Sequence, residues 1–256
     1  MEGKEREEEE DIICLDESFF INDNYQLTTF TFGSHVLQLY CLQAASTDFD
    51  LTGQLVWPGA VLLNDYLSKN AGILQGCSVI ELGSGVGITG ILCSRFCHKV
   101  VLTDHNEEVL KILEKNAELC VSTQSSISCA GLKPKKLEWG NSDQLNHILL
   151  ENPEGFDLVL GADICFQQSS IPLLFDTVKQ LLVHAAPKCK FILAYVSRAK
   201  VMDTLVVHEA IQHGLQMNEV DGTRALVKNL EGVIFEITLE INNCSRGEKA
   251  RIKGSS

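Results

Sequence analysis

The chain has 256 residues, of which 45% are hydrophobic and 21% are charged. This composition is typical of a globular protein and argues against disorder over most of the length. Because α/β domains reach about 250 residues, one domain with short flanking segments is expected. The formal net charge is −13, and an acidic surface repels phosphate backbones, so the charge argues against a nucleic acid partner. No apolar run approaches the roughly 20 residues of a membrane span, so no membrane partner is expected.

The two ends of the chain differ from the rest. Residues 1–11 form an acidic run that we expect to be a disordered tail, and residues 246–256 are polar and basic and are expected to form a flexible tail. A single domain is therefore predicted over residues 12–245. Nothing resembles a signal or transit peptide, so the expected location is the cytoplasm, and also the nucleus. The ten cysteines include no Cys-x-x-Cys pair, which favours free thiols in a reducing compartment over a metal site.

Residues 12–55 are predicted to form a β extension at the N-terminus. Apolar and polar residues alternate over residues 25–42, and Gly33-Ser34 interrupts this pattern near its middle. Alternation of this kind indicates half-buried strands, and glycine suits a tight turn, so an antiparallel hairpin is expected. Residues 12–21 are expected to add a further strand.

From Pro58 onward the pattern changes to alternating helices and strands. The expected strands cover residues 78–82, 99–103, 136–139, 156–162, 189–196 and 233–241, and the expected helices run from Pro58 to about residue 70 and over residues 86–96, 107–120, 171–185 and 199–214. The central strands are apolar throughout, which is typical of a parallel sheet covered by helices on both faces. Right-handed crossovers then predict a doubly wound α/β fold, in which ligands bind at the carboxyl ends of the strands.

A glycine-rich loop follows the first of these strands. It reads Glu81-Leu82-Gly83-Ser84-Gly85-Val86-Gly87 and leads directly into a helix. Glycines let a ligand approach the backbone, and a helix N-terminus suits a carboxylate or a phosphate. Asp104 ends the next strand, where a carboxylate can accept hydrogen bonds from both hydroxyls of an adenosine ribose. The loop alone leaves two cofactors open, because Gly85, Gly87 and Gly90 also match the dinucleotide fingerprint.

Three observations favour S-adenosylmethionine over a nicotinamide dinucleotide. The acid Glu81 lies two residues before the glycines, where a cationic sulfonium and amino group are better tolerated than a pyrophosphate. The chain is too short for a separate substrate domain. None of the four tyrosines begins the Tyr-x-x-x-Lys pair expected of a compact dehydrogenase. Methyl transfer from a sulfonium requires no metal, and no histidines lie at a metal-ligand spacing.

Five ordered segments carry a resemblance to a known family. They are Val56-Trp57-Pro58-Gly59-Ala60, the glycine loop, Thr103-Asp104, Leu137-Glu138-Trp139-Gly140 and Gly161-Ala162-Asp163-Ile164-Cys165-Phe166. On these segments, residues 25–240 resemble the seven-β-strand protein-lysine methyltransferases, whose members modify chaperones, elongation factors and calmodulin. The resemblance implies the Rossmann-like, doubly wound seven-stranded sheet of class I methyltransferases. It also implies a monomer and a protein substrate such as a chaperone or a translation factor.

The resemblance assigns roles to the cofactor-binding residues. Trp57 would flank the methionine part of the cofactor, and Gly83, Ser84 and Gly85 would wrap its backbone-facing part beside Glu81. Asp104 would bind the ribose. Trp139 would pack on the adenine, and Ala162 would lie next to the adenine.

Asp163 and Phe166 are the candidate catalytic residues. They occupy the stretch that reads Asp-x-x-Tyr in this family, with phenylalanine here in place of tyrosine. A carboxylate at this strand end would orient an incoming ammonium and help it lose its proton. Burial of the lysine in an apolar, aromatic-lined channel favours its neutral amine form. The N-terminal hairpin and the loop around residues 222–224 are expected to contact the substrate.

Two alternatives to a lysine acceptor remain open. One is methyl transfer to another nucleophile, such as a small molecule, an arginine or a histidine. The other is a cofactor-binding interaction module that has lost catalysis, which only Phe166 supports.

Overall fold

The computed structural model describes residues 25–43, 49–123, 131–185 and 187–240. The expected tails, and the strand predicted over residues 12–21, lie outside the described residues. The division of the chain into tails and one domain therefore stays a prediction. Within the described ranges, no helix is long and apolar enough to cross a membrane.

The main sheet has a parallel part and an antiparallel part. The parallel strands are β3 (Ser78–Leu82), β4 (Lys99–Asp104), β5 (Leu132–Lys136), β6 (Leu158–Ala162) and β7 (Lys190–Val196), and the antiparallel strands are β8 (Leu215–Glu219), β9 (Ala225–Val227) and β10 (Leu230–Leu239). The order along the sheet is β5-β4-β3-β6-β7-β10-β8, with the short β9 paired to β10. The chain thus reverses direction across the sheet between β3 and β6, which is where ligands bind in folds of this type. The expected doubly wound seven-stranded sheet is confirmed, with β9 as an addition.

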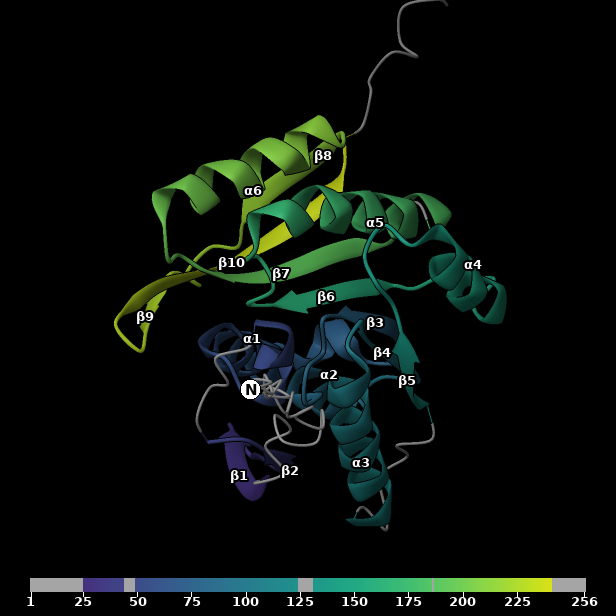
Figure 1. Ribbon diagram of the computed structural model, residues 1–256, viewed down its shortest axis with the longest axis vertical. Coiled ribbons are helices and arrows are strands. Elements are labelled where there is room, and N and C mark those ends of the chain that lie inside the picture. The colour runs from purple at the N-terminus through teal and green to yellow at the C-terminus, as the bar shows by residue number, and fades with distance from the viewer. Residues whose placement is uncertain (1–24, 44–48, 124–130, 186, 241–256) are drawn as a thin grey trace, which may run out of the picture.

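Helices cover both faces of this sheet. One face carries α1 (Pro58–Lys69), α2 (Ile88–Cys93) and α3 (Glu107–Thr123), and the other carries α4 (Ser142–Glu151), α5 (Ile171–His184) and α6 (Lys200–Gln212) (Figure 1). Three short 3-10 helices complete the described elements, at Phe49–Gln54, Ala71–Leu74 and Gln168–Ser170.

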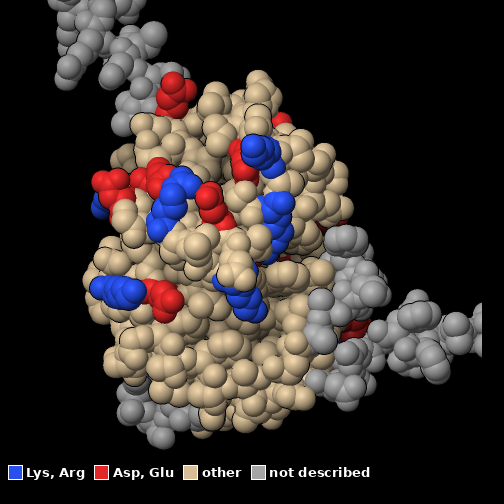
Figure 2. Space-filling view, turned by 90° about the vertical axis from the view of Figure 1, so that its left-hand side faces the viewer, with Lys and Arg blue, Asp and Glu red and all other residues tan. Residues whose placement is uncertain are grey.

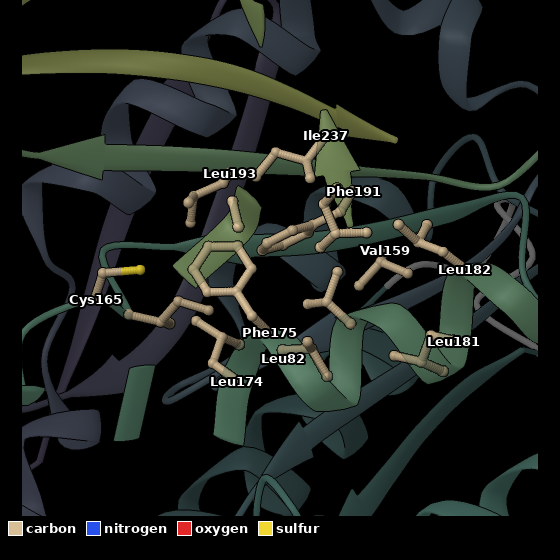
Figure 3. Close-up of a cluster of buried hydrophobic side chains, with 14 of the residues drawn as sticks. Leu82, Val159, Cys165, Leu174, Phe175, Leu181, Leu182, Phe191, Leu193 and Ile237 are labelled. Atoms are coloured by element: carbon tan, nitrogen blue, oxygen red, sulfur yellow. The ribbon is translucent and has the colours of Figure 1, made fainter. Parts of the chain in front are cut away.

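Alternate side chains of each central strand enter opposite cores. In β6, Leu158 and Leu160 pack with α1 to α3, whereas Val159 packs with α4 to α6. Phe175 of α5 and Phe191 of β7 are fully buried in the second core, which Figure 3 shows together with Val159. This two-residue period explains why the central strands read as continuous apolar runs in the sequence.

The N-terminal hairpin is confirmed. Strands β1 (Gln26–Phe32) and β2 (His35–Cys41) pair antiparallel across a turn in which Gly33 has φ +58°. The hairpin contains no Lys, Arg, Asp or Glu, although the chain is strongly acidic. Figure 2 shows charged side chains over the upper part of one face of the molecule and none over the lower part, where the hairpin lies in Figure 1.

Asn116 of α3 joins the hairpin to the glycine loop. Its Oδ1 accepts a hydrogen bond from the backbone N–H of Tyr40 (2.7 Å), and its Nδ2 donates to the Tyr40 carbonyl (2.9 Å) and to the Val86 carbonyl (2.9 Å). The side chain of Asn116 is fully buried. One amide thus ties an isolated two-stranded sheet to the loop at the end of β3.

Four parts of the main sheet and its helices differ from the prediction. The strand expected over residues 136–139 is wrong, because β5 ends at Lys136 and Trp139 lies in the loop that follows. The reason is that β5 is an edge strand with the sequence Leu-Lys-Pro-Lys-Lys, which lacks the apolar run of a central strand. The helix α4 and the strands β8 and β9 were not assigned from the sequence.

Candidate active site

A pocket of about 790 Å³, partly open to solvent, lies at the carboxyl ends of β3, β4 and β6, beside the N-terminus of α1. All ten residues that the sequence marked as candidates line it, namely Trp57, Glu81, Gly83, Ser84, Gly85, Asp104, Trp139, Ala162, Asp163 and Phe166. The structure therefore brings the candidates together in one place, while the role of each stays a prediction.

The glycine loop presents bare backbone to this pocket. Gly83 and Gly85 have φ +61° and +54°, a region that side chains rarely adopt. A Cβ on Gly85 would lie 2.6 Å from the carbonyl oxygen of Gly53, and one on Gly83 would lie 2.9 Å from Cγ2 of Ile164. Gly53, which no sequence motif marked as a site residue, contacts the loop from the segment before α1.

Asp104 is fixed at the end of β4 by two backbone donors. The N–H of Gly85 donates to its Oδ2 (3.1 Å), and the N–H of Asn106 donates to its Oδ1 (3.1 Å). An ionised carboxylate has about four acceptor positions, so after these two bonds it can still accept from ligand hydroxyls, with Nδ1 of His105 also 3.4 Å from Oδ1. The side chain is buried and lines the pocket, which suits the two hydroxyls of a ribose.

Glu81 is a buried carboxyl beside the loop, with 2% of its surface exposed. Burial raises the pKa of Glu81 to about 7, although a hydrogen bond from the N–H of Gly90 (3.0 Å) opposes this shift. A carboxyl with this pKa is partly ionised at neutral pH. A cationic ligand in the pocket favours the ionised form.

Trp139 lies between this pocket and an adjoining one of about 840 Å³. The second pocket is lined by Gly83, Asp104, His105, Leu137, Glu138, Trp139, Phe166, Gln167, Ser169, Ser170 and Leu173. The indole thus offers a flat apolar surface next to Asp104, as an aromatic base bound there would require.

Asp163 follows β6 and occupies the other end of the site. Its φ is +61°, an uncommon conformation for a residue other than glycine. Its Oδ2 accepts a hydrogen bond from the N–H of Gly59 (2.9 Å), in the first turn of α1. A Cβ on Gly59 would lie 2.7 Å from the Cβ of Asp163, so this close approach requires glycine. Asp163 therefore caps α1 from a distant strand.

Arg198, which no sequence motif marked as a site residue, also binds Asp163. Its Nη1 donates to Oδ1 and its Nη2 donates to Oδ2 (2.9 Å), an arrangement that holds the pKa of Arg198 above its ordinary value. The guanidinium also lies over the ring of Trp57, 5.5 Å from its centroid. The Nε1–H of Trp57 donates to the carbonyl of Thr52 (2.8 Å). One arginine thus fixes both an aromatic and an acidic wall residue of the pocket.

Phe166 lies at the rim of both pockets, with 45% of its surface exposed. Its ring is available to a molecule that enters from solvent. Within the described ranges, no group of three or more His, Cys, Asp or Glu side chains is placed to hold a metal ion.

Comparisons with known proteins agree with this geometry. The model of a family described as lysine methyltransferase matches residues 39–209. Protein N-lysine methyltransferase METTL21A of Mus musculus is 32% identical over 159 residues, covering 60% of this chain and 65% of that protein. Protein-lysine N-methyltransferase EFM3 of Chaetomium thermophilum is 33% identical over 156 residues, covering 57% of this chain and 43% of that protein.

A third relative carries a different description. Histone-arginine methyltransferase METTL23 of Mus musculus is 31% identical over 149 residues, covering 57% of this chain and 54% of that protein. The matches to these three relatives span between two fifths and two thirds of the relatives' own length.

Two solved structures show the same fold. An O-methyltransferase from Bacillus cereus in complex with SAH has a TM-score of 0.50 at 19% identity, covering 72% of this chain and 82% of that one. A TehB-like SAM-dependent methyltransferase from Corynebacterium glutamicum has a TM-score of 0.50 at 14% identity, covering 73% of this chain and 90% of that one. The fold is therefore that of the class I methyltransferases, and the family match over most of the chain shows that this protein belongs to the lysine methyltransferase family.

Proposed function

We propose that the protein transfers methyl groups from S-adenosylmethionine to a lysine side chain of another protein. The observation that carries this proposal is that one pocket contains two features. Asp104 offers a carboxylate suited to a ribose, and Trp57 and Asp163 offer an aromatic ring and a second carboxylate. Family membership supports both the donor and the class of acceptor.

The residues of the pocket fit S-adenosylmethionine. Asp104 has acceptor positions left for ribose hydroxyls, Trp139 offers a flat surface for adenine, and the bare loop at Gly83 leaves room for the ligand beside them. The ionisable Glu81 suits the positive charge of the cofactor. When bound, the cofactor supplies a methyl group on a positively charged sulfur, which leaves with the electron pair of the carbon–sulfur bond.

The chain's own contribution is alignment and exclusion of water. Trp57 and Phe166 provide aromatic surface for the aliphatic stem of a lysine, and Asp163 holds the start of α1 in place behind them. An activated donor needs mainly a correctly oriented nucleophile, and orientation alone accelerates such reactions strongly. The acceptor must be the neutral amine, so its proton must pass to water before transfer.

The hairpin β1–β2 is the surface that we propose for the substrate protein. Its uncharged outer face includes half-exposed Leu27 and Val36. Asn116 links this hairpin to the cofactor loop, so a protein bound there lies close to the site. By resemblance we also propose a monomer that acts in the cytoplasm or nucleus on a substrate such as a chaperone or translation factor.

A second acceptor has its own support. The match to a histone-arginine methyltransferase favours an arginine side chain as the alternative.

Labelling separates these acceptors. The purified protein is incubated with radiolabelled S-adenosylmethionine and a cell extract, and label is counted in nuclease-treated, acid-precipitated protein, with Asp104→Ala and Asp163→Ala alongside. Hydrolysis of the labelled bands should give methylated lysine, and both variants should lose the label. Methylated arginine would favour the second acceptor. Binding of the cofactor without any protein label would contradict a protein substrate.

A further inference from the structure

The pairing of Arg198 with Asp163 determines what the pocket offers an incoming amine. The carboxylate accepts three N–H donors, one from Gly59 and two from Arg198, which use three of about four acceptor positions. Asp163 is buried, whereas the Arg198 side chain that pairs with it is 32% exposed. A lysine ammonium therefore meets a neutralised ion pair and not a free carboxylate.

This neutralisation matters for the chemistry. A free carboxylate within about 4–6 Å of an amine stabilises its ammonium form and raises its pKa by one or more units, whereas a nearby cation has the opposite effect. Only the neutral amine has a lone pair with which to attack. An unpaired Asp163 would thus favour binding of the charged lysine and disfavour its reaction.

The other charged and titratable groups near Asp163 and Arg198 are paired with each other, neutral or further away, so this ion pair has the main effect on the pKa of an incoming amine. Tyr195 of β7 donates to Asp203 of α6 (2.6 Å), which also accepts from Ser197 (3.0 Å). Burial raises the pKa of Tyr195 and of Cys165, so both stay neutral over the working range. Further along the pocket wall lie Glu81, Asp104 and His105.

We propose that Arg198 is a positioning residue that neutralises Asp163 and holds Trp57, so that the acceptor lysine reacts as its neutral amine at ordinary pH. The inference rests on the proposed lysine acceptor. Arg198 acts through these two neighbours, since it does not itself line the pocket.

The test is the pH dependence of methyl transfer. Initial rates of methyl-lysine formation are measured from pH 6.5 to 9.5, with saturating radiolabelled S-adenosylmethionine and limiting cell extract as the acceptor, for wild type, Arg198→Gln and Arg198→Lys. In Arg198→Gln, the midpoint of the rising limb should move up by about one pH unit or more. The rate deficit should therefore be large at neutral pH and small at pH 9.5.

Two further variants isolate the cause. Arg198→Lys keeps a cation but cannot bind both oxygens and cover the indole, so it should lower the rate with little change in midpoint. Adding Asp163→Asn to Arg198→Gln removes the freed charge and should return the midpoint toward that of the wild type. Lys190→Gln breaks an ion pair with Glu236 (2.7 Å) at the opposite end of β7 and is the matched control.

Melting temperature and cofactor affinity are recorded for every variant. An unshifted midpoint in folded, cofactor-binding Arg198→Gln would overturn the inference, as would a faster rate than wild type at neutral pH. If Arg198→Gln does not fold, an upward shift in Arg198→Lys as large as one unit would overturn it. A wild type that forms no methyl-lysine would overturn the proposed function as well, whereas an active wild type with unshifted variants overturns only the role of Arg198.

Discussion

The backbone N–H of Gly85 donates a hydrogen bond to Oδ2 of Asp104, with 3.1 Å between the two atoms. The bond ties the glycine loop to the end of the neighbouring strand and aims the carboxylate into the pocket. Asp104→Asn keeps the shape but removes the charge and replaces one acceptor oxygen by an NH2 group, and a hydrogen bond to a charged group contributes about 1.5–3 kcal/mol. Cofactor affinity should fall roughly tenfold to a hundredfold by calorimetry. Glu108→Gln, at a partly exposed position outside the pocket, should bind as wild type does, and an unchanged Kd in Asp104→Asn would exclude the ribose role.

Gly85→Ala should destabilise the fold. The positive φ costs about 1–2 kcal/mol for any residue with a Cβ, and the new atom would lie 2.6 Å from the Gly53 carbonyl oxygen. We expect the free energy of unfolding to drop by about 2 kcal/mol or more in urea titrations. Gly72→Ala is the matched control, because nothing lies within 4 Å of its Cβ position. Equal stability of the two variants would show that the loop accommodates a side chain.

Glu81 should make both stability and cofactor affinity depend on pH. Its pKa of about 7 in the folded protein exceeds its ordinary value of 4.5, so the folded state binds this proton more tightly. The stability that the protonated group contributes is present below about pH 4.5 and is lost as pH rises to about 7. Melting temperature should therefore decline more between pH 5 and 8 in wild type than in Glu81→Gln.

Cofactor affinity should follow the opposite trend. The cation favours ionised Glu81, so affinity should rise toward pH 7 and then level off, with a difference of up to about tenfold between pH 6 and 8. Glu81→Gln should flatten this dependence, whereas exposed Glu154→Gln should retain it. Titration calorimetry at fixed ionic strength measures the affinity of each variant against pH. The same pH dependence in wild type and Glu81→Gln would count against a role of Glu81 in binding the cofactor.

Asn116→Ala should loosen the hairpin from the rest of the protein. The change leaves both backbone groups of Tyr40 and the Val86 carbonyl without their partner, and each unpaired buried group costs about 1–3 kcal/mol. Hydrogen exchange should speed up in β2 and in the glycine loop together. Gln38→Ala, which removes only an exposed contact with Thr29, should leave both segments protected. Faster exchange in β2 alone would show that the two segments are not linked.

Much of this site was readable from the sequence because its residues come directly after apolar strands. Glu81, Asp104 and Asp163 all lie at the carboxyl ends of buried strands, and parallel strands bring those ends to one edge of the sheet. The glycine loop follows an apolar strand, contains closely spaced glycines and leads into a helix. Few conformations other than a strand, a tight turn and a helix are compatible with this order of residues.

Arg198 and Gly53 were not readable in this way. Arg198 lies 35 residues from Asp163 in the sequence, and no local spacing indicates that a guanidinium in a loop will turn toward one carboxylate. Gly53 belongs to a short 3-10 helix with no periodic pattern. The edge strand β5 was misplaced for a related reason, because its one aliphatic residue, Leu132, gives neither the apolar run of a strand buried on both faces nor the alternation of a half-buried strand.

That edge strand has a consequence for how the protein behaves at high concentration. A strand with an unpaired side is a template onto which another chain can add, and it is a common start of aggregation. Here Pro134 lacks the N–H that an added strand would require, and three lysines beside it, two of them paired with Glu107 and Glu151, place charged side chains at the same strand. Growth of the sheet past β5, copy upon copy, is therefore disfavoured by the sequence of the strand itself.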